Sequence, residues 1–367
     1  MPRITNRAIL KAHRQHPLLP LLLRECRSHI SAKNELRWLR DRALSMVSAR
    51  ENGRSPDAPL GWRSLLRSMC HSRSRGVPLQ YILGDQPFGD LEILCERGVL
   101  VPRAETESIT LRAAGLILDA IRKQGHSQGR MGQRTRNLRI VDLCTGTGCI
   151  ALLMHALLAP HINRLSILGI DLSPMALELA NKNLAHNVRL GSLSKRALKE
   201  VYFEQGNVLA RGLGGAGILQ ESQTSIPNAA GYCDVLISNP PYISPRAFRD
   251  GTTSRSVRIF EPKLALVPTI ASSGISINLD RQEDIFYYHI ISLSFEASAK
   301  LVVLECGDRL QAERVRNISR TLAHRYGSGA LSIDIWACSS DPFAHGGISL
   351  NDEPCAVVLR RTDIDTE

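Results

Sequence analysis

Three features are scarce or missing in this sequence of 367 residues, and each excludes or disfavours a class of structure or function. The longest apolar run, residues 18–23, contains a proline and is far shorter than the roughly 20 residues that a membrane-spanning helix requires. Aromatic residues make up only 5%, which leaves few side chains for stacking on nucleic-acid bases. No two of the nine cysteines form a C-x-x-C pair, so we expect neither a disulfide framework nor a metal site.

Acidic residues are missing from the start of the chain. Residues 1–24 contain five lysines and arginines and no aspartate or glutamate. This composition is typical of a mitochondrial transit segment, and it also fits the solvent-exposed face of an N-terminal helix. Residues 1–138 carry 24 basic and 12 acidic side chains, whereas residues 139–367 carry 22 and 23. The front of the chain is therefore basic and suits a docking surface, while the back is neutral.

The remaining composition, 43% hydrophobic and 22% charged, is that of a globular protein whose length suggests two domains. In residues 25–75, apolar side chains such as Leu36 and Leu39 recur at helical spacing, which predicts a small helical domain. Turn residues and β-formers in residues 76–105 predict a β-hairpin linker. Residues 106–367 then form the second domain.

In the second domain, short runs rich in β-branched residues alternate with helical stretches, which is typical of an α/β fold with a mostly parallel sheet. The predicted strands are 138–143, 165–170, 235–237, 301–304, 331–336 and 355–359. No helix-length segment separates the last two, so they predict an antiparallel edge. Segments 206–231 and 268–284 fit no compact unit and are predicted to be insertions.

The first candidate motif is a predicted strand that runs into a glycine-containing turn and then into a helix. Its two glycines let the backbone approach a ligand closely, and the N–H groups of the following helix attract a carboxylate or phosphate. The third glycine of a dinucleotide site is missing. A tight strand-to-helix turn without a ligand is the alternative interpretation. The candidate cofactor-binding residues are Asp142, Cys144, Thr145, Gly146, Thr147 and Gly148.

Asp171 follows the next predicted strand, about 25 residues beyond the glycine turn. An acid at this position can accept hydrogen bonds from both hydroxyls of a nucleoside ribose. Ser173 and Pro174 suit the N-cap and the first position of the helix that comes next. A helix cap is the alternative role for Asp171, and its spacing from the glycine turn favours the ribose.

The most specific motif is Asn239-Pro240-Pro241-Tyr242, which follows the strand at 235–237. The prolines stiffen the chain and leave the Pro240 carbonyl free to accept a hydrogen bond from a ligand. This arrangement suits methyl transfer to a planar NH₂ group, because two acceptors, the Asn239 side-chain oxygen and the Pro240 carbonyl, can hold both N–H bonds. Tyr242 would stack on the flat group. Asn239, Pro240 and Tyr242 are the candidate catalytic residues, and Pro241 completes the candidate substrate site.

Taken together, these motifs resemble the HemK/PrmC family of release factor glutamine methyltransferases. Asn-Pro-Pro-Tyr alone would also fit adenine methyltransferases, but the sequence Pro-Arg-Ala-Glu-Thr-Glu at 102–107 makes the resemblance more specific. The resemblance extends over most of the chain and includes 75–84, 99–107, 140–148, 171, 239–242, 260–266 and 304–308.

The resemblance implies a Rossmann-like class I methyltransferase domain with a seven-stranded, mostly parallel sheet and S-adenosylmethionine as its cofactor. Residues 144–148 would wrap the methionine part of the cofactor, Asp171 its ribose, and Asn207 and Val208 its adenine, with Asn239 also facing it. The tetrad at 239–242 would hold the glutamine of the Gly-Gly-Gln motif of a release factor. Cys144 and Val208 depart from the family pattern, which usually has glycine and an aromatic residue there.

The helical front domain is typical of the bacterial and mitochondrial branches of this family. The insertions and the acid-free start favour the mitochondrial, fungal-type branch, with the helical domain recognising the substrate. We therefore expect a protein of the mitochondrial matrix that acts near the ribosome on a class I release factor, without a membrane or a direct nucleic-acid substrate.

Two other functions remain open from the sequence. The first is a nucleic-acid adenine N6-methyltransferase. The exocyclic amine of adenine is a planar NH₂ group like that of an amide, and the basic front of the chain could contact phosphates. A non-catalytic protein that keeps the fold and binds a release factor or ribosome is the second. No residue is predicted to act as a base, since the amide proton can leave to water.

Overall fold

The computed structural model divides into two compact units. The first consists of Met1–Gln86, Cys95–Arg97 and Ser254–Glu261, and the second of Pro87–Leu94, Gly98–Thr253 and Pro262–Glu367. The predicted insertions fall largely outside the described residues, which lack 210–231 and 270–280. The structure describes residues 4–51, 61–127, 137–209, 232–269, 281–327, 331–337 and 354–361.

The first unit is helical, as the sequence predicts. Thr5 caps its first helix by accepting a hydrogen bond from the backbone N–H of Ala8. Glu35 and Arg73, both largely buried, form a two-pronged ion pair with N–O distances of 2.8 and 3.0 Å that joins the third and fourth helices. The helices are α1 (Asn6–Gln15), α2 (Leu19–Cys26), α3 (His29–Glu51), α4 (Trp62–Ser74), α5 (Leu79–Leu83) and α12 (Arg255–Phe260).

The predicted transit segment, residues 1–24, contains α1 and most of α2. Leu19, Leu22 and Leu23 of α2 are buried in the core of the helical unit. The basic side chains of α1 are exposed, so this helix has the solvent-exposed basic face that the alternative interpretation of its composition describes. A domain boundary after residue 24 would divide this core.

The linker contains the predicted hairpin, formed by β1 (Asp85–Phe88) and β2 (Leu91–Leu94). The short helix α5, which the sequence does not predict, precedes it and ends at Gly84 in the left-handed conformation. Asn183 and Asn187 then take the place of a third strand. Each accepts a hydrogen bond from a backbone N–H of β2 and returns one to the carbonyl of the same residue, Leu94 for Asn183 and Glu92 for Asn187.

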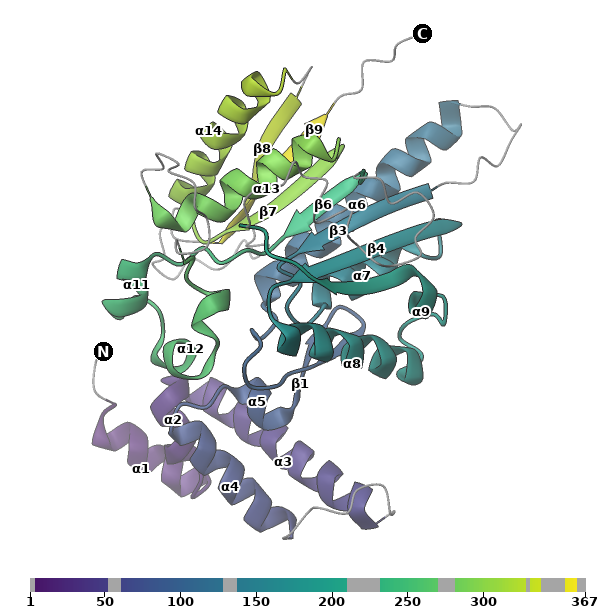
Figure 1. Cartoon of the computed structure of the whole chain (residues 1–367). Helices are drawn as coiled ribbons and strands as arrows, with labels where there is room; N and C mark the ends of the chain where they lie inside the picture. Colours follow the sequence, from purple (N-terminus) through teal and green to yellow (C-terminus); the bar gives the residue numbers. More distant parts are fainter. Residues whose placement is uncertain are drawn as a thin grey trace. The chain divides into compact units, whose positions relative to one another are not determined.

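The second unit is built on a seven-stranded sheet in the order β5-β4-β3-β6-β7-β9-β8, which confirms the predicted fold class (Figure 1). β3 to β7 are parallel, and β9 pairs antiparallel with both β7 and β8, as the predicted antiparallel edge requires. The strands are β3 (Asn137–Leu143), β4 (Arg164–Asp171), β5 (Val201–Gln205), β6 (Val235–Ser238), β7 (Leu301–Cys306), β8 (Leu331–Ala337) and β9 (Cys355–Arg361).

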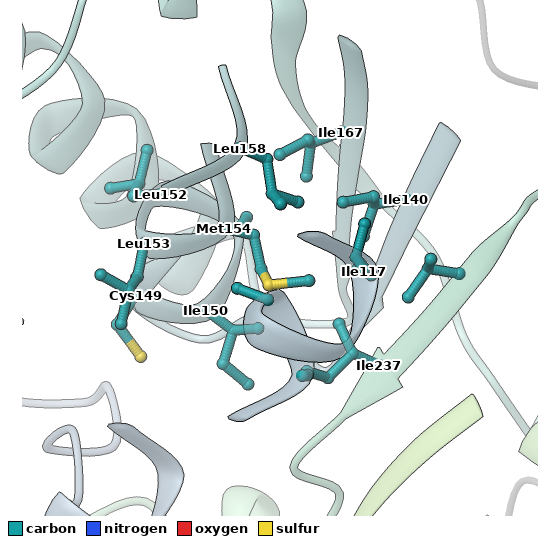
Figure 2. Packing of buried hydrophobic residues seen from close by; sticks show 14 of the residues in the cluster. Ile117, Ile140, Cys149, Ile150, Leu152, Leu153, Met154, Leu158, Ile167 and Ile237 are labelled. Atoms are coloured by element: carbon teal, nitrogen blue, oxygen red, sulfur yellow. The ribbon is translucent and has the colours of Figure 1, made fainter. Parts of the chain in front are cut away.

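Helices cover both faces of this sheet. Successive strand residues such as Ile140 and Val141 point to opposite sides of the sheet. Ile140 belongs to the core under α6 and α7, and Val141 belongs to the core under α13 and α14, so each pair of helices covers one face. Figure 2 shows Ile140, Ile167 and Ile237 from three strands beside Met154 of α7. The helices are α6 (Ala104–Ser127), α7 (Cys149–Leu158), α8 (Pro174–Leu190), α9 (Ala197–Glu200), α11 (Pro245–Arg249), η1 (Lys263–Ala265), η3 (Gln282–Asp284), α13 (Ile285–Glu296) and α14 (Arg309–Arg325).

Across the described ranges, no helix combines the length and apolar character needed to cross a membrane.

Candidate active site

The sheet reverses its direction of growth between β3 and β6. The chain proceeds from β3 outward to β4 and β5, and then returns to place β6 on the other side of β3. Leu143 at the end of β3 pairs with Ser238 at the end of β6. The glycine turn and the Asn-Pro-Pro-Tyr tetrad therefore leave the sheet side by side, at the switch point where open α/β sheets bind ligands.

The glycine turn has a left-handed backbone at three positions, with φ of 60° at Cys144, 56° at Gly146 and 79° at Gly148. A Cβ at Gly148 would lie 2.9 Å from the ring of Phe203, so packing as well as φ requires glycine there. Among the described residues, and apart from its two chain neighbours, a Cβ at Gly146 would meet no atom closer than the Cys144 carbonyl oxygen at 4.0 Å. The backbone at Gly146 is thus open on one side, which fits the close approach of a cofactor.

Asp171, at the end of β4, is tied to this turn. Its Oδ2 accepts a hydrogen bond from the backbone N–H of Gly146 and its Oδ1 one from that of Ser173, both at 2.9 Å. Burial raises the pKa of the Asp171 carboxyl group, and these backbone hydrogen bonds oppose the increase. Asp171, which is predicted to bind the ribose, and the glycine turn, which is predicted to bind the methionine part of the cofactor, are therefore in direct contact.

Asp142 lies beneath the turn and is completely buried. The Thr145 hydroxyl donates a hydrogen bond of 2.6 Å to its Oδ2. Burial raises the pKa of Asp142 to about 7, while the hydrogen bonds from Thr145 and from the backbone of Ala151 counteract the rise. Asp142 thus supports the turn from inside the fold.

The predicted adenine contacts, Asn207 and Val208, follow β5. The Asn207 side-chain oxygen accepts a hydrogen bond from the backbone N–H of Leu209 at 3.0 Å. Val208 is buried and packs into the core on the α13 and α14 side of the sheet. The side chain of Val208 therefore contributes to the protein interior.

Asn239 is held by a side chain distant in the sequence. Its Nδ2 donates a hydrogen bond of 3.0 Å to the Oγ1 of Thr106, whose hydroxyl donates one of 2.7 Å to the Oε2 of Glu305. Pro240 and Pro241 are buried. No residue in the described ranges donates a hydrogen bond to the Asn239 side-chain oxygen or to the Pro240 carbonyl. These are the two acceptors that the sequence predicts for the substrate NH₂ group.

Tyr242 is more constrained than the sequence predicts. Its hydroxyl donates to the Oε1 of Glu305 at 3.3 Å, and its ring lies so close to Gly307 that a Cβ there would be 3.0 Å from Tyr242 Cδ2. Burial and the neighbouring Glu305 raise the pKa of Tyr242 well above its ordinary value. The hydroxyl edge of the ring therefore faces the protein.

Thr106 and Glu305 lie in two of the stretches that carry the family resemblance, 99–107 and 304–308, but the sequence predicts no role for either residue. Glu305 is buried inside the apolar strand β7, and burial raises its pKa to about 7 despite the hydrogen bonds from Thr106 and Tyr242. Gln311 is not predicted from the sequence either; its Nε2 donates to the Tyr242 carbonyl at 3.3 Å and to the Asp284 Oδ1 at 3.2 Å. An acid within an apolar strand was the available signal for Glu305.

Groups of three or more His, Cys, Asp or Glu side chains that could hold a metal ion do not occur among the described residues.

Comparison with known proteins identifies the relatives of this chain, although no protein-family model matches it. It is 35% identical over 290 residues to the Mitochondrial MRF1 N(5)-glutamine methyltransferase MTQ1 of Saccharomyces cerevisiae, covering 78% of this chain and 76% of that protein. The Probable MRF1 mitochondrial N(5)-glutamine methyltransferase mtq1 of Schizosaccharomyces pombe is 33% identical, with coverage of 87% and 89%.

A bacterial relative, the Release factor glutamine methyltransferase of Haemophilus influenzae, is 29% identical, with coverage of 70% and 72%. Among solved structures, the N-terminal domain of human METTL16 in complex with SAH is 15% identical with a TM-score of 0.44, covering 81% of this chain and 84% of that one. The three sequence relatives are named for glutamine methylation, which does not favour the adenine alternative. The chain belongs to the family of S-adenosylmethionine-dependent release factor N(5)-glutamine methyltransferases.

Proposed function

We propose that this enzyme methylates the side-chain amide nitrogen of the glutamine in the Gly-Gly-Gln motif of a mitochondrial class I release factor. The observation that carries the proposal is the pair of available acceptors at the end of β6, the Asn239 Oδ1 and the Pro240 carbonyl oxygen. A primary amide has two N–H bonds in one plane, and two fixed acceptors match them.

The amide nitrogen is a weak nucleophile because its lone pair is delocalised into the carbonyl group. Asn239 and Pro240 would hold both N–H bonds and so aim the nitrogen toward the methyl donor, which is catalysis by positioning. S-adenosylmethionine, when bound, supplies a methyl group on a positively charged sulfur. The nitrogen gains the methyl carbon, the carbon–sulfur bond breaks with its electrons going to sulfur, and one amide proton leaves to water.

The cofactor would lie along the glycine turn. We assign the methionine part to residues 144–148, where the backbone at Gly146 is open, and the ribose to Asp171, which already contacts that turn. Asn207 and Val208 are assigned to the adenine end. Since the Val208 side chain is buried, we expect its backbone to make any contact with the adenine.

A mitochondrial substrate and a mitochondrial location are supported by the two fungal relatives, whose names both contain MRF1 and the word mitochondrial, and we place the enzyme in the matrix. We assign the helical unit to recognition of the release factor, near the ribosome, through its basic surface, which includes the exposed residues Arg37, Arg40 and Arg63. Reversing these three charges should weaken methylation at physiological salt. Unchanged methylation would exclude this docking surface.

The proposal is tested with purified enzyme, labelled S-adenosylmethionine and a mitochondrial release factor. We expect label in the wild-type factor and none when the glutamine of Gly-Gly-Gln is replaced by glutamate, which lacks the amide nitrogen. Label in RNA or DNA but not in the release factor would instead support adenine methylation.

A further inference from the structure

The hydrogen bonds behind Asn239 run in one direction. Glu305 in its charged form only accepts, so the single hydroxyl proton of Thr106 must point to Glu305 Oε2, 2.7 Å away. The oxygen of Thr106 is then left as an acceptor toward Asn239, 3.0 Å away. The only donor on the Asn239 side chain is its NH₂ group, which must therefore face Thr106.

We propose that Thr106 and Glu305 are positioning residues that fix the orientation of the Asn239 amide, so that its oxygen, and not its NH₂ group, faces the substrate. This inference rests on the proposed function, because it concerns the acceptor for the substrate amide.

The orientation matters because the oxygen and the NH₂ group of an asparagine amide have nearly the same shape but opposite hydrogen-bonding polarity. If the amide rotated by half a turn, its NH₂ group would face the NH₂ group of the substrate glutamine. Two donors would then meet, and the substrate nitrogen would lose one of its two acceptors. Neither Asn239 nor the rigid prolines beside it prevents this rotation; the polarity of Thr106 does.

Glu305 sets that polarity from a buried position. Its second oxygen, Oε1, accepts from the Tyr242 hydroxyl at 3.3 Å, so both oxygens act as acceptors. A protonated Glu305 could donate to Thr106 and release the Thr106 proton toward Asn239, which would permit the reversed amide. The charged groups that act on Glu305 are Glu105, which raises its pKa, and Arg103, which lowers it. Glu305 in turn faces the thiols of Cys149, Cys306 and Cys355 and raises their pKa values.

Burial raises the pKa of Glu305 to about 7. The chargeless form therefore becomes populated as the pH falls through neutrality, and the rate should fall with it. Activity requires the carboxylate, so it is retained above the pKa of Glu305 and lost below it.

The first experiment compares three single variants under saturating cofactor. Thr106→Val removes the hydroxyl and nearly preserves shape, and we expect kcat to fall by about 10- to 100-fold, since misplacing a reacting group by about 1 Å costs on that order. Thr106→Ser should restore most of the rate. Thr110→Val is the matched control: Thr110 is buried one turn further along α6, and within the described part of the chain its hydroxyl donates to the Thr106 carbonyl alone, at 2.7 Å. It should keep kcat within about twofold.

Cofactor affinity, measured by calorimetry, separates positioning from misfolding. Thr106→Val should bind S-adenosylmethionine as the wild type does. Equal kcat for Thr106→Val and the wild type would overturn the inference, as would equal losses in Thr106→Val and Thr110→Val. If the wild-type enzyme methylates no release factor at all, the proposed function fails and this inference falls with it, whereas an active wild type with an equally active Thr106→Val overturns the inference alone.

The second experiment measures kcat from about pH 8 to about pH 6 for the wild type and for Glu305→Gln. Gln has the shape of Glu and no charge, so we expect a low rate that no longer depends on pH through this group, whereas the wild-type rate falls toward pH 6. A Glu305→Gln enzyme with the wild-type rate and the wild-type acid limb would contradict the inference. A purely structural role would lower stability without removing the pH dependence.

Discussion

Thr106 and Asn239 lie 133 residues apart in the chain and are joined by a hydrogen bond of 3.0 Å. Thr106 stands in the first turn of α6, and Asn239 follows β6 at the switch point of the sheet. The same edge of the sheet brings Asp171 to Gly146, again from separate strands. The site therefore forms only when the sheet assembles. Substitutions at the ends of these segments should affect methyl transfer and cofactor binding to different extents, according to which of the two the segment serves.

Replacing Asn239 by Ala removes the acceptor for the substrate amide but none of the contacts between Asp171 and the glycine turn. We expect kcat to fall by about 100-fold or more, on the scale of losing an aligned group, with cofactor affinity changed by less than about threefold. Steady-state kinetics and calorimetry measure the two quantities. Asn317→Ala, on the exposed surface of α14, is the control. Loss of cofactor binding in Asn239→Ala would contradict this assignment.

Asn183 connects the hairpin to the cofactor turn. It accepts from the Leu94 N–H at 2.7 Å and donates to the Thr147 carbonyl at 2.9 Å. Asn183→Ala leaves the partly buried Leu94 N–H and the buried Thr147 carbonyl without this partner, so we expect the free energy of unfolding to fall by about 1–3 kcal/mol and cofactor affinity to weaken. Asn181→Ala, two residues earlier on the exposed face of α8, should change neither. Similar denaturation curves for the two variants would argue against this connection.

Deleting residues 1–24 should destabilise the helical unit. The deletion removes Leu19, Leu22 and Leu23, whose burial contributes about 1.5–3 kcal/mol each. A lower midpoint of thermal unfolding is the expected result, with deletion of residues 1–3 as the control. We therefore expect any processing on import to leave α1 and α2 in place. An unchanged midpoint after the larger deletion would show that residues 1–24 are dispensable to the fold.

The pH dependence of stability tests the burial of Asp142. Burial raises its pKa from 3.8 to about 7, so the folded protein holds this proton more tightly than the unfolded chain. The resulting stabilisation is present below about pH 4 and is lost as the pH rises to about 7. Asp142→Asn removes the titration. The wild-type free energy of unfolding minus that of the variant should fall over this window in urea titrations; a constant difference would contradict the argument.

The sequence predicts most of the sheet because its buried strands are continuous apolar runs, and all six predicted strands are present. β5 was not predicted: its residues Tyr202 to Glu204 are only partly buried at the sheet edge, which weakens the apolar signal. The motifs at Gly146, Asp171 and Asn239 were recognisable because each has a local spacing.

The partners of these motifs were not predictable in the same way. The bond from Thr106 to Asn239 depends on where α6 meets the end of β6, and no local spacing records that. The burial of the Val208 side chain likewise follows from core packing and not from its position after a strand. The Tyr242 ring has a hydroxyl that Glu305 engages, which only the assembled site reveals.

The most direct test of the account is mass spectrometry of the Gly-Gly-Gln peptide of the mitochondrial release factor, isolated from cells with and without this protein. We predict one methyl group on the glutamine side chain in cells that contain the protein and an unmodified glutamine in cells that lack it, with methylation restored by the wild type and not by Asn239→Ala. The same extent of methylation in cells with and without the protein would contradict the account.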